Sequence, residues 1–339
     1  MKILCPIMAS ADIDVLDPEQ YGAEFFCGYL PEWWIKKYND SDAYRLFKNL
    51  STPINNRNGA GANIPRIDEL RSAVNKCRQK NTRLFLAVNA KYYPEYVYED
   101  LRRYLREVYD AGIRDMIICD MGLISYVSRE FPDVKIAVSC LNQITNSRAV
   151  EFYTGFSGVE RIVFPRHMSS EEIRSIAQHF PNLEFEYFIF SNKCLYDDGY
   201  CRGVHEFTPI CKDLYFGEYY HCGGVPVGDE HKEILLRNEH EFRLWTRSES
   251  RIDLSGYCTG SFGCMACALL TLKDVPNITS VKLSIRGHGV EERLRQVKMA
   301  RAVISCVENS GDYQQIQSIV SKLYGKDTLC KTGMSCIMV

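Results

Sequence analysis

The chain has 339 residues, of which 46% are hydrophobic and 25% are charged, so it can bury one large core or two moderate ones. Its 41 Lys and Arg residues nearly balance 43 Asp and Glu residues, which excludes a strong overall field for phosphate backbones but leaves open a local basic rim for RNA. No apolar run approaches the roughly 18 residues that a membrane span requires, so we expect no membrane partner.

Short β-rich runs recur along the chain, with helical patterns between them. Several are nearly continuous apolar runs, which is typical of strands covered on both faces by helices. In chain order the runs are KILCPI from Lys2, EFFCGY from Glu24, RLFLAVN from Arg83, DMIICD from Asp115, KIAVSC from Lys135, RIVFP from Arg161, EFEYFIF from Glu184 and SVKLSI from Ser280.

Helix signals lie between these runs. Pro65 opens IPRIDELRSAVNKCRQKN, and Pro94 opens PEYVYEDLRRYLREVYDAG, which Gly112 ends. Ser169 and Ser170 stand before two glutamates and predict a capped helix start. The segments VEERLRQVKMARAVISCVEN and DYQQIQSIVSKLYG predict two successive helices near the end of the chain. Eight strands alternating with helices favour an α/β fold, a (β/α)8 TIM-like barrel, over a doubly wound open sheet.

A long insert separates the seventh predicted strand, which ends near Phe190, from the eighth, which starts near Ser280. It is far longer than a usual connection between a strand and a helix. Because active sites of such barrels lie at the carboxyl ends of the strands, we expect the insert to lie at the barrel mouth. We assign residues 1–305 to the barrel, with a cysteine-rich metal-binding insert at 191–270, and residues 306–339 to a C-terminal helix and tail.

Seven of the fifteen cysteines fall in this insert. The start of the chain, MKILCPIMASADIDVLD, lacks a signal-peptide pattern, so we expect a cytoplasmic protein with reduced thiols. Reduced thiols in turn-like sequence suit zinc or an iron–sulfur cluster, and the CxxC pair of Cys264 and Cys267 also fits a redox dithiol. Cysteines that fit small apolar core residues instead are Cys5, Cys27, Cys77, Cys119 and Cys306.

Polar residues follow several predicted strands, and the carboxyl ends of barrel strands converge on one pocket. Arg166 and Arg286 favour a functional role, because a planar guanidinium at a barrel mouth can bind carboxylate or phosphate. Asn63 and Asn146 fit turn and helix caps at least as well. We predict catalytic roles for Arg166, Arg286, Lys282, Asn89 and Asp120; other polar residues at strand ends are Arg57, Lys91, Asn142, His167 and Asn192.

Several longer segments carry a family pattern: GAEFFCGY, NRNGAGANI, LAVNAKYYPEYVYEDLRRYLREVYDAGIRDMIICDMGLI, KIAVSCLNQITNSRAVEFY, RIVFPRHMSSEEI and FIFSNKCLYDDGYC. Through them, most of the first 305 residues resemble the U32 family. Members of that family are labelled peptidases but include oxygen-independent hydroxylases that act on RNA bases or on the ubiquinone precursor ring. Some members work as heteromeric pairs, so the resemblance also implies a homologous partner subunit as an option.

The resemblance implies a [4Fe–4S] cluster held by four cysteines, with zinc as the alternative. The last segment is similar to the cluster motif of the family, in which two cysteines flank a Ser-Gly pair, here Asp198 and Gly199. By this resemblance the ligands are Cys194, Cys201, Cys211 and Cys267, with Cys222, Cys264 and Cys258 as alternates.

The chain also departs from the family pattern. In KLSIR, Ser284 stands where the family has a glutamate, so a family carboxylate is missing from the predicted barrel mouth. Further departures lie at Cys140, Leu141, His167, Ile285, Phe190 and Ser191. These differences indicate a divergent member, whose substrate does not follow from the resemblance.

We therefore predict an iron–sulfur enzyme that hydroxylates an aromatic or nucleobase-like substrate, in RNA or a quinone precursor, without molecular oxygen. Clustered tyrosines at Tyr92, Tyr93, Tyr96 and Tyr98 fit either packing or base stacking. One alternative is a peptidase or other hydrolase; the chain has neither HExxH nor GxSxG, but a zinc-bound water could serve. The other alternative is a non-catalytic, cluster-bearing partner subunit, which the missing carboxylate at Ser284 motivates.

Overall fold

The computed structural model describes residues 1–39, 54–57, 60–192, 221–222, 225–226, 262–324 and 336. Four of the predicted ligand cysteines, Cys194, Cys201, Cys211 and Cys258, lie outside the described residues, as does most of the predicted insert. In the described part of the chain, no helix combines the length and the apolar character needed to cross a membrane.

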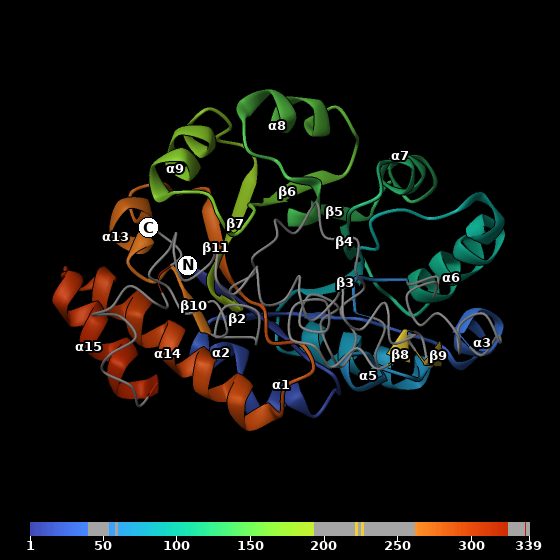
Figure 1. Ribbon diagram of the computed structural model, residues 1–339, viewed down its shortest axis with the longest axis horizontal. Coiled ribbons are helices and arrows are strands. Elements are labelled where there is room, and N and C mark those ends of the chain that lie inside the picture. The colour runs from blue at the N-terminus through green and yellow to red at the C-terminus, as the bar shows by residue number, and fades with distance from the viewer. Residues whose placement is uncertain are drawn as a thin grey trace.

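Parallel strands close into a barrel (Figure 1). Strand β11 lies between β7 and β1, and β7 also pairs with β6, which completes the ring. The barrel strands are β1 (Lys2–Pro6), β2 (Ala23–Cys27), β3 (Leu84–Val88), β4 (Asp115–Ile118), β5 (Lys135–Val138), β6 (Val159–Val163), β7 (Glu184–Asn192) and β11 (Ile278–Leu283). The eight predicted strands and the TIM-like barrel are confirmed.

Shorter strands add to this barrel. Strand β10 (Phe262–Cys264) pairs antiparallel with the carboxyl end of β7, and β8 (His221–Cys222) pairs with β9 (Val225–Pro226). Because β10 lies directly before Cys267, one end of the predicted insert returns to the rim of the barrel beside β7.

Helices surround the strands (Figure 1). The bounds are α1 (Asp12–Val15), α2 (Pro18–Tyr21), α3 (Glu32–Trp34), the π-helix η1 (Ile35–Asn39), η3 (Ala60–Ala62), α5 (Ile67–Gln79), η4 (Glu95–Val97), α6 (Tyr98–Asp110), α7 (Met121–Glu130), η5 (Cys140–Asn142), α8 (Ser147–Thr154), α9 (Ser170–Gln178), α13 (Ala268–Leu272), α14 (Val290–Glu308) and α15 (Tyr313–Tyr324). The boundary that we placed after residue 305 falls inside α14.

Local signals set several helix ends. Ser169 and Glu172 form the predicted capping box at the start of α9. Gly112 follows α6 with a φ of +98°, a left-handed conformation that glycine adopts at little cost. Asn146 caps α8 by accepting a hydrogen bond from the Ala149 amide at 3.0 Å, which confirms the capping interpretation of this residue.

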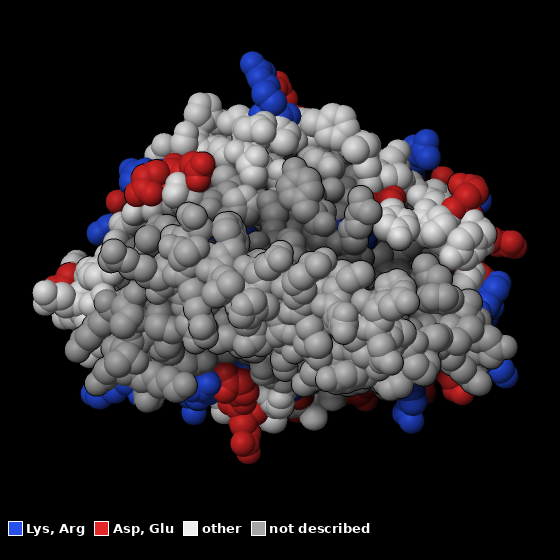
Figure 2. Space-filling model, in the orientation of Figure 1, with Lys and Arg blue, Asp and Glu red and all other residues white. Residues whose placement is uncertain are grey.

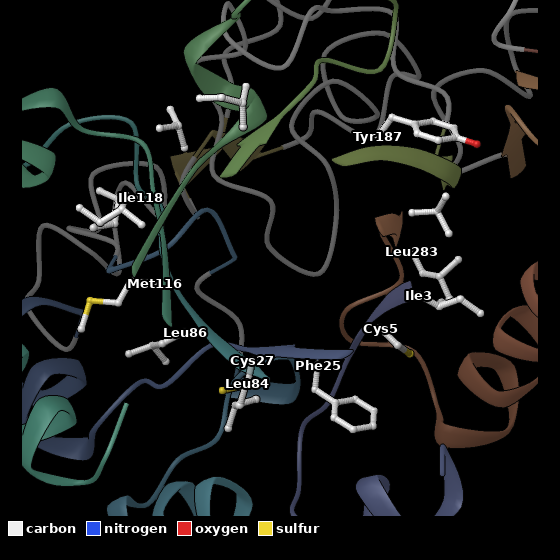
Figure 3. Packing of buried hydrophobic residues seen from close by; sticks show 14 of the residues in the cluster. Ile3, Cys5, Phe25, Cys27, Leu84, Leu86, Met116, Ile118, Tyr187 and Leu283 are labelled. Carbon is white, nitrogen blue, oxygen red and sulfur yellow. The ribbon is translucent and has the colours of Figure 1, made fainter. Parts of the chain in front are cut away.

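The hydrophobic core lies mainly between the barrel and its helices. Ile3, Cys5, Phe25, Cys27 and Leu283 alternate along their strands to face outward, and all are buried (Figure 3). The alternate residues of the strands face inward, and they form a much smaller apolar cluster of Leu4, Phe26, Phe85, Ile117 and Ala137. The remaining inward positions are largely charged.

An ion-pair network fills much of the barrel interior. Arg161 of β6 contacts Glu24 at 3.1 Å, Glu184 at 2.6 Å and Glu186 at 3.1 Å. At the amino-terminal side, Arg83 binds Asp115 at 2.6 Å and also reaches Glu184. The interior of the barrel is therefore a packed, neutralised structure, and a ligand site is to be sought at its carboxyl end.

Candidate functional site

The floor of the barrel mouth combines a lysine with two aromatic rings. Lys282 Nζ lies 2.8 Å from Glu186 Oε1, 4.8 Å from the ring centroid of Phe26 and 5.9 Å from that of Phe188. Arg166, which follows β6, places its guanidinium 5.7 Å from the same Phe188 ring. Two of the five predicted catalytic residues, Lys282 and Arg166, therefore meet at one aromatic surface.

Glu186 holds this floor in place. Burial opposes ionisation of Glu186, but the charges of Lys282 and Arg161 outweigh it and keep the pKa of Glu186 below its ordinary value. The Ser280 hydroxyl also donates to Glu186 Oε2 at 2.9 Å. Because Glu186 is fully buried and ionised, it fixes the Lys282 ammonium at the mouth.

A second group of residues lies at the rim, where β2 and β11 end. We call Gly28, Asn55, Asn63 and Arg286 the rim cluster. Arg286 Nη2 donates to Asn55 Oδ1 at 2.8 Å, and Asn55 Nδ2 donates to Asn63 Oδ1 at 2.9 Å. Asn63 Nδ2 in turn donates to the Arg57 carbonyl at 2.7 Å, so a chain of amide hydrogen bonds holds residues 54–57 against the barrel end.

Gly28 makes this packing possible. A Cβ atom at Gly28 would stand 2.0 Å from Asn63 Oδ1 and 3.0 Å from Arg286 Nη1. No real Cβ contact is as short as the first of these distances. The rim cluster therefore needs glycine at the end of β2, because the amide and the guanidinium press directly on the backbone.

Two other predicted catalytic residues hold the backbone. Asp120 caps α7 by accepting a hydrogen bond from the Leu123 amide at 2.7 Å. Asn89 Oδ1 accepts a hydrogen bond from the Asn56 amide at 3.2 Å, which ties the end of β3 to residues 54–57. Both lie at the carboxyl ends of strands, but these contacts position the loops around the mouth.

The predicted tyrosine cluster divides into two groups. Tyr93 is buried and donates from its hydroxyl to the Ile54 carbonyl, which anchors the segment after β3. Tyr92 and Tyr96 are 72% and 68% exposed, and the Tyr96 ring lies 6.3 Å from the Tyr38 ring. On the face shown in Figure 2, both basic and acidic side chains lie around the edge of the view.

Two of the predicted sulfur ligands belong to the described residues. Cys264 ends β10, and Cys267 stands directly before α13. The Ala266 amide donates to Cys264 Sγ at 3.5 Å, and hydrogen bonds of this kind tune thiolates that bind metal clusters. The remaining ligand candidates lie outside the described residues, except that the backbone of Cys222 forms part of β8.

Tyr187 lies behind these two thiols. Burial raises the pKa of Tyr187 well above its ordinary value, and the neighbouring Cys264 and Cys267 add to this effect. Its buried hydroxyl has no hydrogen-bond partner among the described residues, although buried tyrosines usually find one. Soft sulfur donors beside an unsatisfied O–H donor fit a thiolate-bound group, because a ligated sulfur would accept that hydrogen bond.

Several site residues escaped the sequence analysis. Glu24, Arg161 and Glu186 were read only as parts of apolar strands, and Asn55 was not singled out. A charged residue inside such a run is itself a signal, because it must face a partner across the barrel. Asn55 has no comparable signal, since its role depends on two contacts that only the folded chain shows. Asn63 is eight residues away in sequence, and Arg286 is 231 residues away.

Comparisons with known proteins find a matching family model and several relatives. The family model described as peptidase family U32 matches residues 51–218. The tRNA hydroxylation protein P1 of Bacillus subtilis (strain 168) is 27% identical over 135 residues, which are 40% of this chain and 31% of that protein. The tRNA hydroxylation protein P of Escherichia coli (strain K12) is 32% identical over 99 residues, 29% of this chain and 22% of that protein. The match thus spans less than a third of either relative.

A solved structure titled as that of the U32 peptidase Mk0906 is also similar. It is 12% identical, and the match covers 56% of this chain and 68% of that one with a TM-score of 0.38.

Proposed function

Because the chain is a divergent member of peptidase family U32, we propose that it is an iron–sulfur enzyme that hydroxylates a base of RNA without molecular oxygen. The observation that carries the proposal is the similarity to proteins named for tRNA hydroxylation in two bacteria. The barrel supports it, since the family match includes residues 54–57, Asn63 and Arg166, which lie at the carboxyl ends of the strands.

The proposed cofactor is a [4Fe–4S] cluster held by Cys194, Cys201, Cys211 and Cys267, with Cys222, Cys264 and Cys258 as alternates and zinc as the alternative metal. The described thiols support a soft-metal site, because Cys264 receives an amide hydrogen bond and faces the buried Tyr187 hydroxyl together with Cys267. When bound, the cluster would supply redox or Lewis-acid chemistry that the side chains of the barrel lack.

The described residues would bind and orient the substrate. Phe26 and Phe188 are buried beneath the mouth, so a planar base would bind above their rings, with the positive charges of Lys282 and Arg166 beside it. Glu186 holds the Lys282 ammonium in place through a 2.8 Å ion pair, so that the ammonium can donate a hydrogen bond to the substrate. Tyr92, which is 72% exposed, would stack on a neighbouring base outside the mouth.

Nucleoside analysis tests this proposal. Total tRNA and ribosomal RNA from the native host, with and without the gene, would be digested and compared by mass spectrometry. We expect one nucleoside with an added oxygen atom to disappear on deletion, and to return with the intact gene but not with a Cys194→Ala variant. Identical nucleoside profiles, with changed cleavage of peptides instead, would favour the hydrolase alternative.

A further inference from the structure

Arg286 is a buried arginine whose guanidinium forms few hydrogen bonds. Its side chain lies in the rim cluster and is only 4% exposed. The structure gives its guanidinium one hydrogen bond, from Nη2 to Asn55 Oδ1 at 2.8 Å. The Nη1 group is buried and has no hydrogen-bond partner among the described residues. A guanidinium offers five N–H donors, so most of its bonding capacity is unused.

Other buried arginines of the barrel are bonded very differently. Arg161 contacts three glutamates, and Arg293 binds Asp12 Oδ2 at 2.7 Å and the Pro6 carbonyl at 3.0 Å. In contrast, no acidic side chain of the described residues forms an ion pair with Arg286. An isolated buried charge is costly, so a protein retains one only where something else compensates it.

The surroundings of Arg286 increase this cost. Burial, with the neighbouring charge of Arg57, lowers the pKa of the Arg286 guanidinium to about 9. The same two causes, burial and Arg57, lower the pKa of His288. Arg57 and Arg286 thus concentrate positive charge at the end of β11. Glu292 acts in the opposite direction on His288 but forms no ion pair with Arg286 among the described residues, so the region favours the arrival of a negative charge.

The position of Arg286 is also fixed before any ligand arrives. Asn55 is bonded to both Asn63 and the Arg57 amide, and Gly28 lets the guanidinium rest on the backbone of β2. Such a pre-organised group loses little conformational entropy on binding, as is typical of built anion sites.

We propose that Arg286 is the anchor for one oxyanion, a carboxylate or phosphate group, of the ligand that binds at the carboxyl end of the barrel. This inference deepens the proposed function and rests on it for the location of the ligand. The bound oxygen accepts from Nη1 and replaces the acidic partner that Arg161 and Arg293 find within the chain. The fold thus retains a destabilising charge because the ligand needs it.

The test compares two substitutions in the anaerobically purified full chain. Arg286→Met keeps the length of the side chain and removes the charge, and Asn55 Oδ1 keeps its bond to the Arg57 amide. The substitution removes a buried charge that has no ion-pair partner among the described residues. We therefore expect the ligand-free variant to melt at a higher temperature than the wild type, by roughly 2 °C. Arg293→Met is the control, and it should melt lower, since it leaves the buried Asp12 carboxylate without its ion-pair partner.

Oxyanion binding is then measured as the rise in melting temperature with sodium phosphate, sodium benzoate or a short RNA stem-loop, each against sodium chloride at equal ionic strength. We expect a saturable rise in the wild type and in Arg293→Met, and none in Arg286→Met. A response to benzoate or phosphate alone indicates a small ligand, and a response to the RNA alone indicates a backbone phosphate.

Two results would overturn the inference: no saturable response in the wild type, or an equal response in Arg286→Met. If Arg286→Met does not fold, Arg286→Lys serves instead; it keeps the charge but loses the planar fork, and should weaken the response at least tenfold. The outcome is separable from that of the proposed function, because an anion response that depends on Arg286 without any hydroxylated nucleoside would disprove only the latter.

Discussion

The interior of the barrel and the rim cluster both bury arginine, but they compensate its charge in different ways. In the interior, Arg161 meets three glutamates, and Lys282 meets Glu186. At the rim, Arg286 forms one hydrogen bond within the described part of the chain, to the side-chain oxygen of Asn55. From this difference we infer that the charge of Arg161 serves the fold, whereas the charge of Arg286 is kept for a ligand.

Breaking the interior network should have the largest effect on stability. Glu186→Gln removes the carboxylate of Lys282 and one partner of Arg161, and should lower the free energy of unfolding by about 3–5 kcal/mol in urea titrations. Glu160→Gln is the matched control, because Glu160 pairs with Lys135 on an exposed surface and should cost less than about 1 kcal/mol. Similar losses in both variants would show that the interior pairs are not special.

Acid should weaken the same network. The folded protein holds the pKa of Glu186 below its ordinary value of 4.5, so the stabilisation is complete above that value and is lost as the pH falls through the lowered one. We expect the stability difference between the wild type and Glu186→Gln to narrow as the pH falls below 4.5. A difference that stays constant to pH values well below this range would contradict the assignment of an ionised Glu186.

Packing at the rim should be the next most sensitive feature. Gly28→Ala places a methyl group against Asn63 and Arg286, and should cost about 1–3 kcal/mol in unfolding free energy while disturbing the rim cluster. Gly61→Ala is the control, since a Cβ there meets nothing within 4 Å, and it should change stability by less than about 0.5 kcal/mol. Equal tolerance at both glycines would mean that the rim cluster is not closely packed.

Substitutions of Asp120 should have the smallest effect on stability, and they separate its role as a helix cap from a catalytic role of its carboxylate. Asp120→Ala removes the cap of α7 and should cost about 1 kcal/mol, whereas Asp120→Asn keeps a capping oxygen and should cost little. Thermal melts of the two variants check this order. Nucleoside hydroxylation by the Asn variant then reports on the carboxylate alone, and its loss at full stability would support the catalytic prediction for Asp120.

Much of the fold could be predicted because its signals are local. Apolar runs marked each strand, and residues such as Ser169, Gly112 and Asn146 marked helix ends by their own chemistry. The sequence also singled out Arg286 and Lys282 as residues at strand ends. The sequence could not show that Lys282 has a carboxylate partner whereas Arg286 has none among the described residues, because that difference depends on which strands face each other across the barrel.

The contacts of the interior and the rim arise from closure of the barrel. Glu24 and Arg161 are far apart in sequence and meet only because β2 and β6 face across the ring. Asn55 reaches Arg286 in the same way, from a segment that follows β2 to one that follows β11. Periodicity describes one strand at a time, so neither contact follows from it.

Iron and acid-labile sulfide in the anaerobically purified chain test the proposed enzyme most directly. We expect about four of each per chain, with a broad absorbance band near roughly 400 nm. Cys194→Ala and Cys201→Ala should lose most of this content, whereas Cys77→Ala should not, because Cys77 is a buried core residue with a pKa raised by burial to about 12. Equal losses in all three variants would contradict the assignment of Cys194 and Cys201 as ligands. Zinc without sulfide would contradict the cluster itself and place the hydrolase alternative first.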